Sequence, residues 1–441
     1  MVIYLLIFSF LIRLVGINQS LWLDEAISIS VAKMPLNQIV SGFSHFDFHP
    51  PLYYWFLNIW IKIFGENVGI MRLSSVIFAV ITIGIVYLIG KEIKDKKYGL
   101  WSAVFVSINP LLIYYSQELR MYSMTSMWLT GAVYYLIKMI PSPDSGNKIS
   151  WKNILGFNLM TFLSFVTFYG SIFGICAMIL YLLLTKKNKL FLYNSVGIIC
   201  AMLVVSQLLI SQLGYSGNML NQVTNWGLVL GKVNIKNLLL IFLKFSIGRV
   251  SWYPKQTYYL IGGIWALIVW SIVGKNILKN KLLSFLLVTP IIFGIIFSIK
   301  SPLLQYFRFL YLIPVLSLIL ANNKRIIVKL LLAFGFLVFS FTYLLNPKMH
   351  REDWKSLAES LDNNQKIYMI ASFSDPIKFY NPSIEIIDIK TSNPVEKEIT
   401  IVPYGGIIHG IEIKQKMEKL GYQQTEIKNF REIVLESWKW R

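Results

Sequence analysis

The sequence predicts a mainly α-helical, polytopic membrane protein of about eleven transmembrane helices, followed by a small C-terminal α/β domain. Three observations predict this class. Of the 441 residues, 55% are hydrophobic, and the mean hydropathy is +0.57. Apolar runs of about twenty residues, long enough to cross a bilayer, recur from the N-terminus to about residue 345. Beyond that point the composition changes abruptly to that of a soluble domain.

The expected membrane spans follow one another from the first residues. The first run has no basic segment before it and no small-residue cleavage site before Asn18, so we interpret it as a retained helix and not as a signal peptide. Cys176 and Cys200 both lie inside apolar runs, where packing is the expected role. The spans are expected at roughly 2–18, 68–90, 99–115, 122–140, 153–169, 170–185, 190–211, 257–274, 282–299, 309–321 and 326–345.

Short Lys-rich connections predict the orientation. They fall at every second connection, and by the positive-inside rule they face the cytoplasm. The N-terminus is then cytoplasmic and the C-terminal domain extracytoplasmic, in a multi-pass protein of the plasma membrane. Because the lysines flank lipid, the net charge of +20 indicates topology and membrane lipids as partners, with no nucleic acid. The connections read KEIKDKKYG (91–99), TKKNK (185–189), GKNILKNK (274–281) and NNKR (322–325).

Two external loops are too long to be simple turns. Residues 19–67 contain AISISVAK and LYYWFLNIWIKIFG, which suit helices lying in the membrane interface. Residues 212–256 contain KNLLLIFLKFSIGR, which suits the same role. These loops belong to a transmembrane domain of residues 1–345. In the soluble domain, residues 346–441, DWKSLAESL and IEIKQKMEKLGY predict helices, whereas KIYMIAS and EITIVPYG predict strands.

Acidic residues are scarce in the membrane domain. Fourteen of the 22 Asp and Glu residues lie in the soluble domain, and none occurs between residues 145 and 345. Glu92, Asp95 and Asp144 fall in cytoplasmic connections. Burying a charge costs about 2.5 to 3.5 kcal/mol at the bilayer centre, so acids beside a membrane end are expected to line a polar cavity. The external candidates are Asp24, Glu25, Asp47, Glu66 and Glu118.

Three external clusters group these acids with basic and aromatic residues. LWLDEA carries Asp24 and Glu25; FDFHPPLYYW carries Asp47, His49 and Tyr53; NPLLIYYSQELRMYS carries Glu118, Arg120 and Tyr122. In this order the clusters resemble the C superfamily of glycosyltransferases, in particular the group of protein O-mannosyltransferases and lipid A aminoarabinose transferases. The resemblance covers residues 1–345 in layout and is most specific in residues 20–125.

The resemblance implies an inverting transfer of a hexosyl or pentosyl group from a polyprenyl-phosphate sugar. The acceptor would be a lipid, glycan or protein hydroxyl on the outer face of the membrane. A carboxylate must accept the proton of that hydroxyl, and we assign Asp24 to this role with Glu25 beside it. Arginines must hold the phosphate as its charge develops; Arg308 is the first choice. The expected substrate-binding residues are His49, Tyr53, Glu118, Arg120, Tyr122, Tyr169, Arg249 and Arg308.

One departure from the family pattern concerns the outer end of the fifth span. Related bacterial proteins often carry a His-Tyr pair there, whereas this chain reads TFYGS, so that Phe168 stands at the His position and Tyr169 remains. A donor contact at this point therefore rests on Tyr169 alone.

Other interpretations of these residues remain open. Asp24 also suits the N-cap of the helix that follows. Glu118 and Arg120 also suit a solvated turn pair, and Arg308 a side chain that extends to the lipid headgroups. No certain cofactor is indicated, because the acids lack metal-ligand spacing, although a divalent ion near Asp24, Glu118 and His49 is an alternative. A transporter or flippase of a lipid-linked or small solute, and a noncatalytic binding relative, are the alternative functions.

Overall fold

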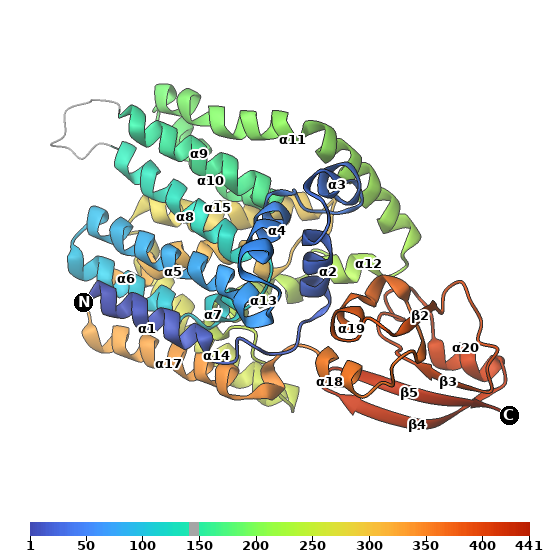
Figure 1. Cartoon of the computed structure of the whole chain (residues 1–441). Coiled ribbons are helices and arrows are strands. Elements are labelled where there is room, and N and C mark those ends of the chain that lie inside the picture. Colours follow the sequence, from blue (N-terminus) through green and yellow to red (C-terminus); the bar gives the residue numbers. More distant parts are fainter. Residues whose placement is uncertain (141–149) are drawn as a thin grey trace.

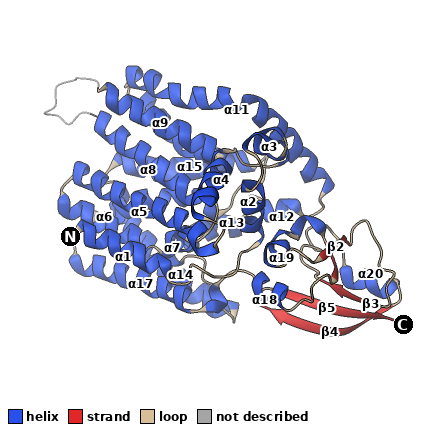
Figure 2. Cartoon of the chain, viewed as in Figure 1, coloured by secondary structure: helices blue, strands red, loops and turns tan. Residues whose placement is uncertain are grey.

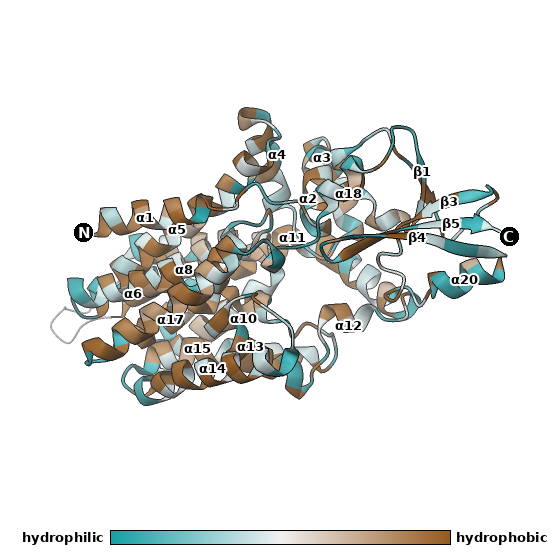
Figure 3. Ribbon diagram, turned by 90° about the horizontal axis from the view of Figure 1, so that it is seen from below, coloured by the Kyte–Doolittle hydropathy of each residue, from teal (hydrophilic) through white to brown (hydrophobic). Residues whose placement is uncertain are grey.

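The computed structural model describes residues 1–140 and 150–441, so Asp144 lies outside the described residues. Two parts are visible along the chain: a bundle of helices and a smaller domain that contains the strands (Figures 1 and 2). The N-terminus and the connection between α5 and α6 lie at the end of the bundle far from this smaller domain (Figure 1). The bundle helices carry mainly hydrophobic residues, and the outer strands of the smaller domain are more hydrophilic (Figure 3).

The bundle is formed by helices from both halves of the membrane domain. Two short 3-10 segments, η2 (Tyr169–Ser171) and η3 (Tyr306–Leu312), precede α10 and α16. The bundle helices are α1 (Val2–Leu14), α5 (Val68–Ile93), α6 (Lys96–Ile108), α7 (Pro110–Ser116), α8 (Tyr122–Met139), α9 (Trp151–Thr167), α10 (Ile172–Leu184), α11 (Asn188–Gln222), α14 (Lys255–Ile277), α15 (Lys281–Ser298), α16 (Ile313–Ala321) and α17 (Ile326–Leu345).

The expected count of about eleven spans is not confirmed. Five described helices are long and apolar enough to cross a membrane, namely α5, α11, α14, α15 and α17. A sixth span results if α6 and α7, bent by 60° at Asn109, are counted together. Two predicted runs are shorter as helices: α1 ends at Leu14 after 13 residues, about 20 Å of helix, and η3 occupies the start of the predicted run at 309–321, so that α16 begins only at Ile313.

The two long loops, at residues 19–67 and 212–256, form short helices. The first loop contains α2 (Leu23–Ala32), α3 (Leu36–Ser41), the 3-10 segment η1 (Phe43–Phe46) and α4 (Leu52–Phe64). The second contains α12 (Trp226–Leu230) and α13 (Ile235–Ile247). Helices α2, α3 and α12 lie between the bundle and the C-terminal domain (Figure 1). Both sequence stretches around α4 and α13 were expected to form interfacial helices, and both are helical.

The C-terminal domain begins after α17 and is built on a five-stranded sheet of order β2-β1-β3-β5-β4. Strand β1 runs parallel to β2 and β3, whereas β5 is antiparallel to β3 and β4. Its strands are β1 (Lys366–Met369), β2 (Glu385–Asp388), β3 (Glu398–Ile401), β4 (Tyr422–Phe430) and β5 (Ile433–Trp440). Its helical segments are η4 (Pro347–Met349), α18 (Trp354–Glu359), η5 (Ala371–Phe373), α19 (Asp375–Tyr380) and α20 (Ile413–Lys419).

Helix α2 joins the two parts of the molecule. Its first residue, Leu23, packs in the hydrophobic core of the C-terminal domain together with Trp354. The Tyr380 hydroxyl of α19 accepts a hydrogen bond from the backbone of Leu21 at 2.8 Å, and Ser30 donates to Asp375 at 2.6 Å. The C-terminal domain is therefore docked on the same helix that carries the LWLDEA cluster.

Candidate active site

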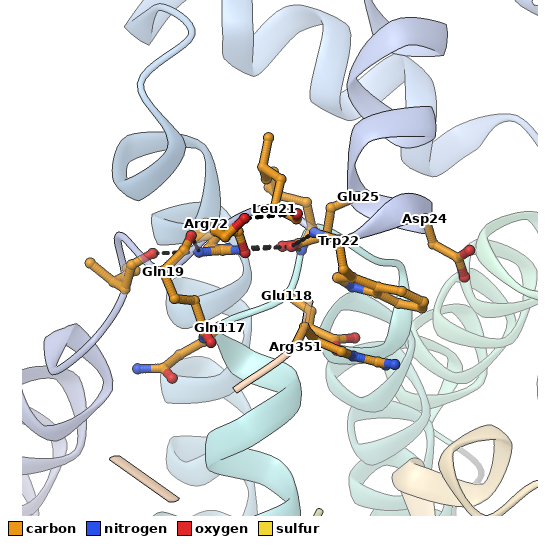
Figure 4. A network of polar contacts seen from close by, with 12 residues as sticks. Gln19, Leu21, Trp22, Asp24, Glu25, Arg72, Gln117, Glu118 and Arg351 are labelled. Atoms are coloured by element: carbon orange, nitrogen blue, oxygen red, sulfur yellow. Dashed lines mark hydrogen bonds and ion pairs between the residues drawn. The ribbon is translucent and has the colours of Figure 1, made fainter. Parts of the chain in front are cut away.

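Asp24 and Glu25 lie in the first turn of α2. Trp22, and not Asp24, occupies the N-cap position, and its backbone amide donates to Glu25 Oε2 at 3.4 Å. Asp24 therefore does not cap the helix. Its side chain keeps 37% of its surface exposed, whereas Glu25 is completely buried. The two carboxylates point in different directions, Glu25 toward Arg72 and Asp24 away from it (Figure 4).

Glu25 is held by a buried arginine of α5. Arg72 donates to Glu25 through Nε at 2.8 Å and through Nη2 at 2.6 Å. Glu25 Oε1 also accepts from the backbone amide of Leu119 at 2.8 Å. Arg72 donates further to the carbonyl oxygens of the chain that leads into α2 (Ile17, Gln19 and Ser20). Both oxygens of Glu25 are thus engaged in fixing α2, α5 and the turn at Leu119 to one another.

That turn carries the third sequence cluster. Arg120 lies with its Nη2 atom 3.7 Å from Asp24 Oδ2, and its Nη1 atom donates to Ser28 at 3.1 Å and to the Asp24 carbonyl at 3.4 Å. Although burial lowers the pKa of Arg120, Asp24 and other nearby groups raise it overall. The first and third sequence clusters are therefore in direct contact.

Glu118, by contrast, pairs with a residue that follows the membrane domain. Its Oε1 atom accepts hydrogen bonds from Arg351 Nε at 3.2 Å and Nη2 at 3.1 Å. Its Oε2 atom is buried and without a hydrogen-bond partner among the described residues. The guanidinium of Arg351 stacks on the ring of Trp22, with 3.5 Å between its central carbon and the ring centroid (Figure 4).

The second cluster forms a small hydrogen-bonded group beside this site. Asp47 accepts from the Tyr54 hydroxyl at 2.7 Å and lies 3.3 Å from His49 Nδ1. Burial lowers the pKa of His49; Asp47 opposes this effect, while Arg120 and Arg308 lower the pKa further. We therefore expect His49 to be neutral at pH 7, a hydrogen-bonding group and not a cation for phosphate. The neighbouring Tyr53 is buried.

Tyr169 and Tyr122 are each connected to His49 through one intermediate residue. Tyr169 donates to Gln212 at 2.7 Å, and Gln212 donates to the His49 carbonyl at 2.9 Å. The ring of Phe168, the residue that replaces the expected histidine, stacks on His49 with 6.2 Å between centroids. Tyr122 packs edge to face on Phe168 at 5.8 Å. Aromatic packing thus surrounds the position at which the family pattern has a histidine.

Two arginines from the second half of the chain complete the site. Arg308, in η3, donates to the Leu230 carbonyl at 3.3 Å, and no ion pair with an acid is found for it in residues 1–140 and 150–441. Arg249 donates to the Tyr114 hydroxyl at 2.6 Å and lies over the ring of the same tyrosine. Arg308 is close enough to His49 to affect its pKa, whereas Arg249 lies on the Tyr114 side.

Among the described residues, no group of three or more His, Cys, Asp or Glu side chains is arranged to hold a metal ion. Glu118 is paired with Arg351 and His49 with Asp47, instead of converging on Asp24.

Sequence reasoning missed Arg72 and Arg351. Arg72 had a signal, since a charge inside a predicted span requires a buried partner. Arg351 had none, because 233 residues separate it from Glu118.

Comparison with known proteins supports the resemblance drawn from the motifs. The sequence model of the family described as dolichyl-phosphate-mannose-protein mannosyltransferase matches residues 48–215. No curated protein sequence matches the chain significantly.

Among solved structures, ArnT from Cupriavidus metallidurans in the apo state has a TM-score of 0.59 at 10% identity, covering 99% of this chain and 97% of that chain. The same protein bound to undecaprenyl phosphate gives a TM-score of 0.58 at 11% identity, with the same coverage. The oligosaccharyltransferase of Archaeoglobus fulgidus gives 0.52 at 11% identity, covering 90% of this chain and 65% of that chain. The chain thus shares the fold of ArnT and, more distantly, that of the archaeal oligosaccharyltransferase.

Proposed function

We propose that the protein is an inverting glycosyltransferase that moves a sugar from a polyprenyl phosphate to an acceptor hydroxyl on the outer face of the plasma membrane. The observation that carries this proposal is that the carboxylate of Asp24 is less firmly engaged by other residues than those of its acidic neighbours. The carboxylates of Glu25, Asp47 and Glu118 are engaged by Arg72, by Tyr54 with His49, and by Arg351, respectively. Asp24 is partly exposed, and its ion pair with Arg120 is long at 3.7 Å.

Asp24 is accordingly the carboxylate best suited to accept a proton. In an inverting transfer, one base removes the proton of the acceptor hydroxyl as its oxygen attacks the anomeric carbon, and the bond from that carbon to the phosphate oxygen breaks. Arg120 keeps the Asp24 carboxylate oriented. Arg308 is the proposed partner of the phosphate that leaves. No carboxylate among the described residues forms an ion pair with Arg308, and one guanidinium group can bind two phosphate oxygens at once.

A lateral groove offers room for the lipid part of such a donor. It has a volume of about 670 Å³ and lies between α13 and α14. A second apolar cavity of about 300 Å³ continues it toward α15 and shares Phe242 and Trp270 with it. The groove is lined by Ile235, Lys236, Leu239, Leu240, Phe242, Leu243, Tyr259, Gly263, Ala266, Leu267 and Trp270.

The C-terminal part of α13 changes from apolar to cationic. Lys244 and Arg249 line a polar cavity of about 170 Å³ together with Lys348. Burial lowers the pKa of Lys244 to about 7, with Arg249 and Lys255 contributing. An apolar groove along α13 and a cluster of cations at its C-terminal end, in a cavity also lined by Glu432, suit a lipid that ends in a phosphate. No described feature favours the transporter alternative.

The test is a transfer assay with purified protein, a panel of radiolabelled polyprenyl-phosphate sugars and membranes as acceptor. Asp24→Asn should fold and bind donor but turn over at least ~100-fold more slowly, the lower range for a lost general base. Glu66→Gln is the matched control, because Glu66 is an exposed external acid paired with Lys33. Near-normal turnover by Asp24→Asn would exclude Asp24 as the general base. If the wild-type protein transfers sugar from none of the donors, the proposed function is wrong.

A further inference from the structure

Arg351 connects the C-terminal domain to the candidate active site. It lies between η4 and α18, beyond the last bundle helix, yet its side chain is only 14% exposed. It contacts one residue from each of two sequence clusters, Glu118 through two hydrogen bonds and Trp22 through its ring. Figure 4 shows the three side chains stacked beneath the first turn of α2.

The position of Arg351 is set by the sheet of the C-terminal domain. Arg431, at the turn between β4 and β5, donates through Nε to the Arg351 carbonyl at 2.6 Å. The backbone amide of Asp353 donates in return to the Arg431 carbonyl at 3.0 Å. The segment 351–353 is therefore fixed to the β4–β5 turn, and the side chain of Arg351 is aimed at Glu118 only while the domain is docked.

Glu118 in turn belongs to the turn that carries Arg120. Other contacts hold the backbone of this turn: Ser75 donates to the Glu118 carbonyl at 2.7 Å, and the Leu119 amide donates to Glu25. The Glu118 side chain depends on Arg351. A buried carboxylate that loses its partner keeps a large desolvation cost that nothing offsets, and the turn that bears this cost also carries Arg120.

We propose that Arg351 is a positioning residue of the transferase site, supplied by the C-terminal domain, which neutralises Glu118 and so holds the turn that keeps Arg120 opposite Asp24. The inference rests on the proposed function and deepens it. Docking of the C-terminal domain then completes the active site, and the domain is more than an appended binding module.

The charges that face Glu118 give this proposal a pH signature. Burial raises the pKa of Glu118; Arg351 lowers it, Glu25 raises it, and Arg249 lowers it. Without Arg351, the pKa of Glu118 rises further, so this carboxyl becomes neutral at a higher pH than in wild type. A neutral Glu118 no longer leaves a buried charge without a partner in the turn, and the defect of an Arg351 variant should therefore diminish as the pH falls.

The experiment is a double-mutant cycle in the transfer assay with Arg351→Met, Glu118→Gln and both together. Arg351→Met should lower kcat by roughly tenfold to a hundredfold, the range for a displaced reacting group, with a much smaller change in the donor KM. The double variant should be several-fold more active than Arg351→Met, because neither partner is left unpaired. Arg351→Lys, which keeps the charge but not the planar fork, should fall between Arg351→Met and wild type.

Lys355→Met is the matched control, because Lys355 is an exposed cation of α18 whose ion pair with Glu359 lies outside the site. It should leave turnover and the pH profile unchanged. If the double variant is no more active than Arg351→Met, or if the ratio of Arg351→Met to wild-type turnover does not rise at lower pH, the proposal is overturned.

A readout without catalysis separates this inference from the proposed function. Difference infrared spectroscopy, with Glu118→Gln used to assign the band, follows protonation of the Glu118 carboxyl. The titration midpoint should move to higher pH in Arg351→Met and stay in place in Lys355→Met. A shifted midpoint in a protein without transfer activity would contradict the function and not the positioning contact; normal transfer by the wild type with an unmoved midpoint would contradict the contact alone.

Discussion

Neighbouring residues in the LWLDEA motif have different roles because successive side chains of an α-helix diverge by about 100°. Glu25 faces the bundle, where Arg72 neutralises it, and Asp24 faces Arg120 and solvent. The sequence predicted that an acid pair would stand beside the membrane end. It could not predict which of the two acids is free, because the partners that decide this are distant: Arg72 is 47 residues from Glu25, and Arg120 is 96 residues from Asp24.

Arg13 illustrates the same limit within the bundle. A charge inside the first apolar run is expected either to pair with an acid or to extend to the headgroups. In the structure Arg13 is fully buried and donates to the carbonyl oxygens of Ser9 at 2.9 Å and Ser107 at 3.0 Å. The backbone of α6 thus supplies a partner that no motif in the sequence indicates.

Arg308 is the residue whose role can be tested apart from acid-base chemistry. A guanidinium binds two phosphate oxygens at once, and lysine does not reproduce that geometry. Arg308→Lys should therefore weaken the binding of sugar-free polyprenyl phosphate, and Arg308→Ala should weaken it further, by roughly 2 to 4 kcal/mol in a partly desolvated site. Calorimetric titration of wild type and both variants measures this directly.

Arg325→Ala provides the control for the Arg308 titration, because Arg325 is an exposed arginine of the basic connection before α17. The affinity of the Arg325→Ala variant for polyprenyl phosphate should equal that of the wild type. Equal affinities for wild type, Arg308→Lys and Arg308→Ala would show that Arg308 merely extends toward the headgroups, and the phosphate would then be assigned to Arg120 or Arg249.

At the scale of elements, hydropathy predicted where apolar chain lies better than how it is divided into helices. The run at 99–115 is one apolar stretch, but the Asn109 side chain caps a new helix by accepting from the amides of Leu111 and Leu112. Pro110 at the first position of α7 suits that new start. The bend at this point is 60°, so one predicted span becomes α6 and α7.

In the C-terminal domain, two strands were predicted and three were not. KIYMIAS and EITIVPYG contain β1 and β3, whose central positions are buried. Most residues of β4 are exposed, so its hydrophobic signal was weak, and the pairing partner β5 lies at the end of the chain. The hairpin that holds Arg351 through Arg431 was therefore not predicted, and the link between domain and site was missed with it.

The groove between α13 and α14 gives a prediction about an element. Gly263 lines the groove, and an added Cβ atom at this position would meet no atom within 4 Å. Gly263→Trp should therefore fill the groove without disturbing the helix packing. If the polyprenyl chain lies there, the variant should raise the KM for long-chain donors several-fold and affect a short-chain donor much less, because apolar contact scales with buried area. Steady-state assays with donors of graded chain length measure the difference.

A tryptophan placed on another helix is the control, because it shows whether any added tryptophan changes the dependence of KM on donor chain length. Gly214, on α11, is likewise free of atoms within 4 Å of an added Cβ and does not line the groove. Gly214→Trp should leave the dependence of KM on chain length unchanged. An identical KM series for Gly263→Trp and wild type would place the lipid chain elsewhere.

At the scale of the whole molecule, the candidate site, the docked C-terminal domain and α2 lie together, and the N-terminus lies at the far end of the bundle (Figure 1). The sequence predicted the order of these parts from composition alone. It could not predict that Ile27 and Tyr380 pack against both hydrophobic cores, because contact between distant segments leaves no periodic pattern. The outward orientation of the C-terminal domain stays a prediction from the Lys-rich connections.

That orientation is open to a direct labelling experiment. After Cys176→Ala and Cys200→Ala remove the two native thiols, single cysteines are placed at Val395 in the C-terminal domain and at Leu278 in the Lys-rich connection at residues 274–281. The two positions are matched controls for one another, since both side chains are highly exposed, 89% and 87%. If the Lys-rich connections face the cytoplasm, a membrane-impermeant thiol reagent should label Val395→Cys and spare Leu278→Cys in intact cells, and should label both after the cells are opened. Labelling of Leu278→Cys alone in intact cells would place Asp24 and Arg308 on the cytoplasmic side, where a polyprenyl-phosphate sugar on the outer face cannot reach them.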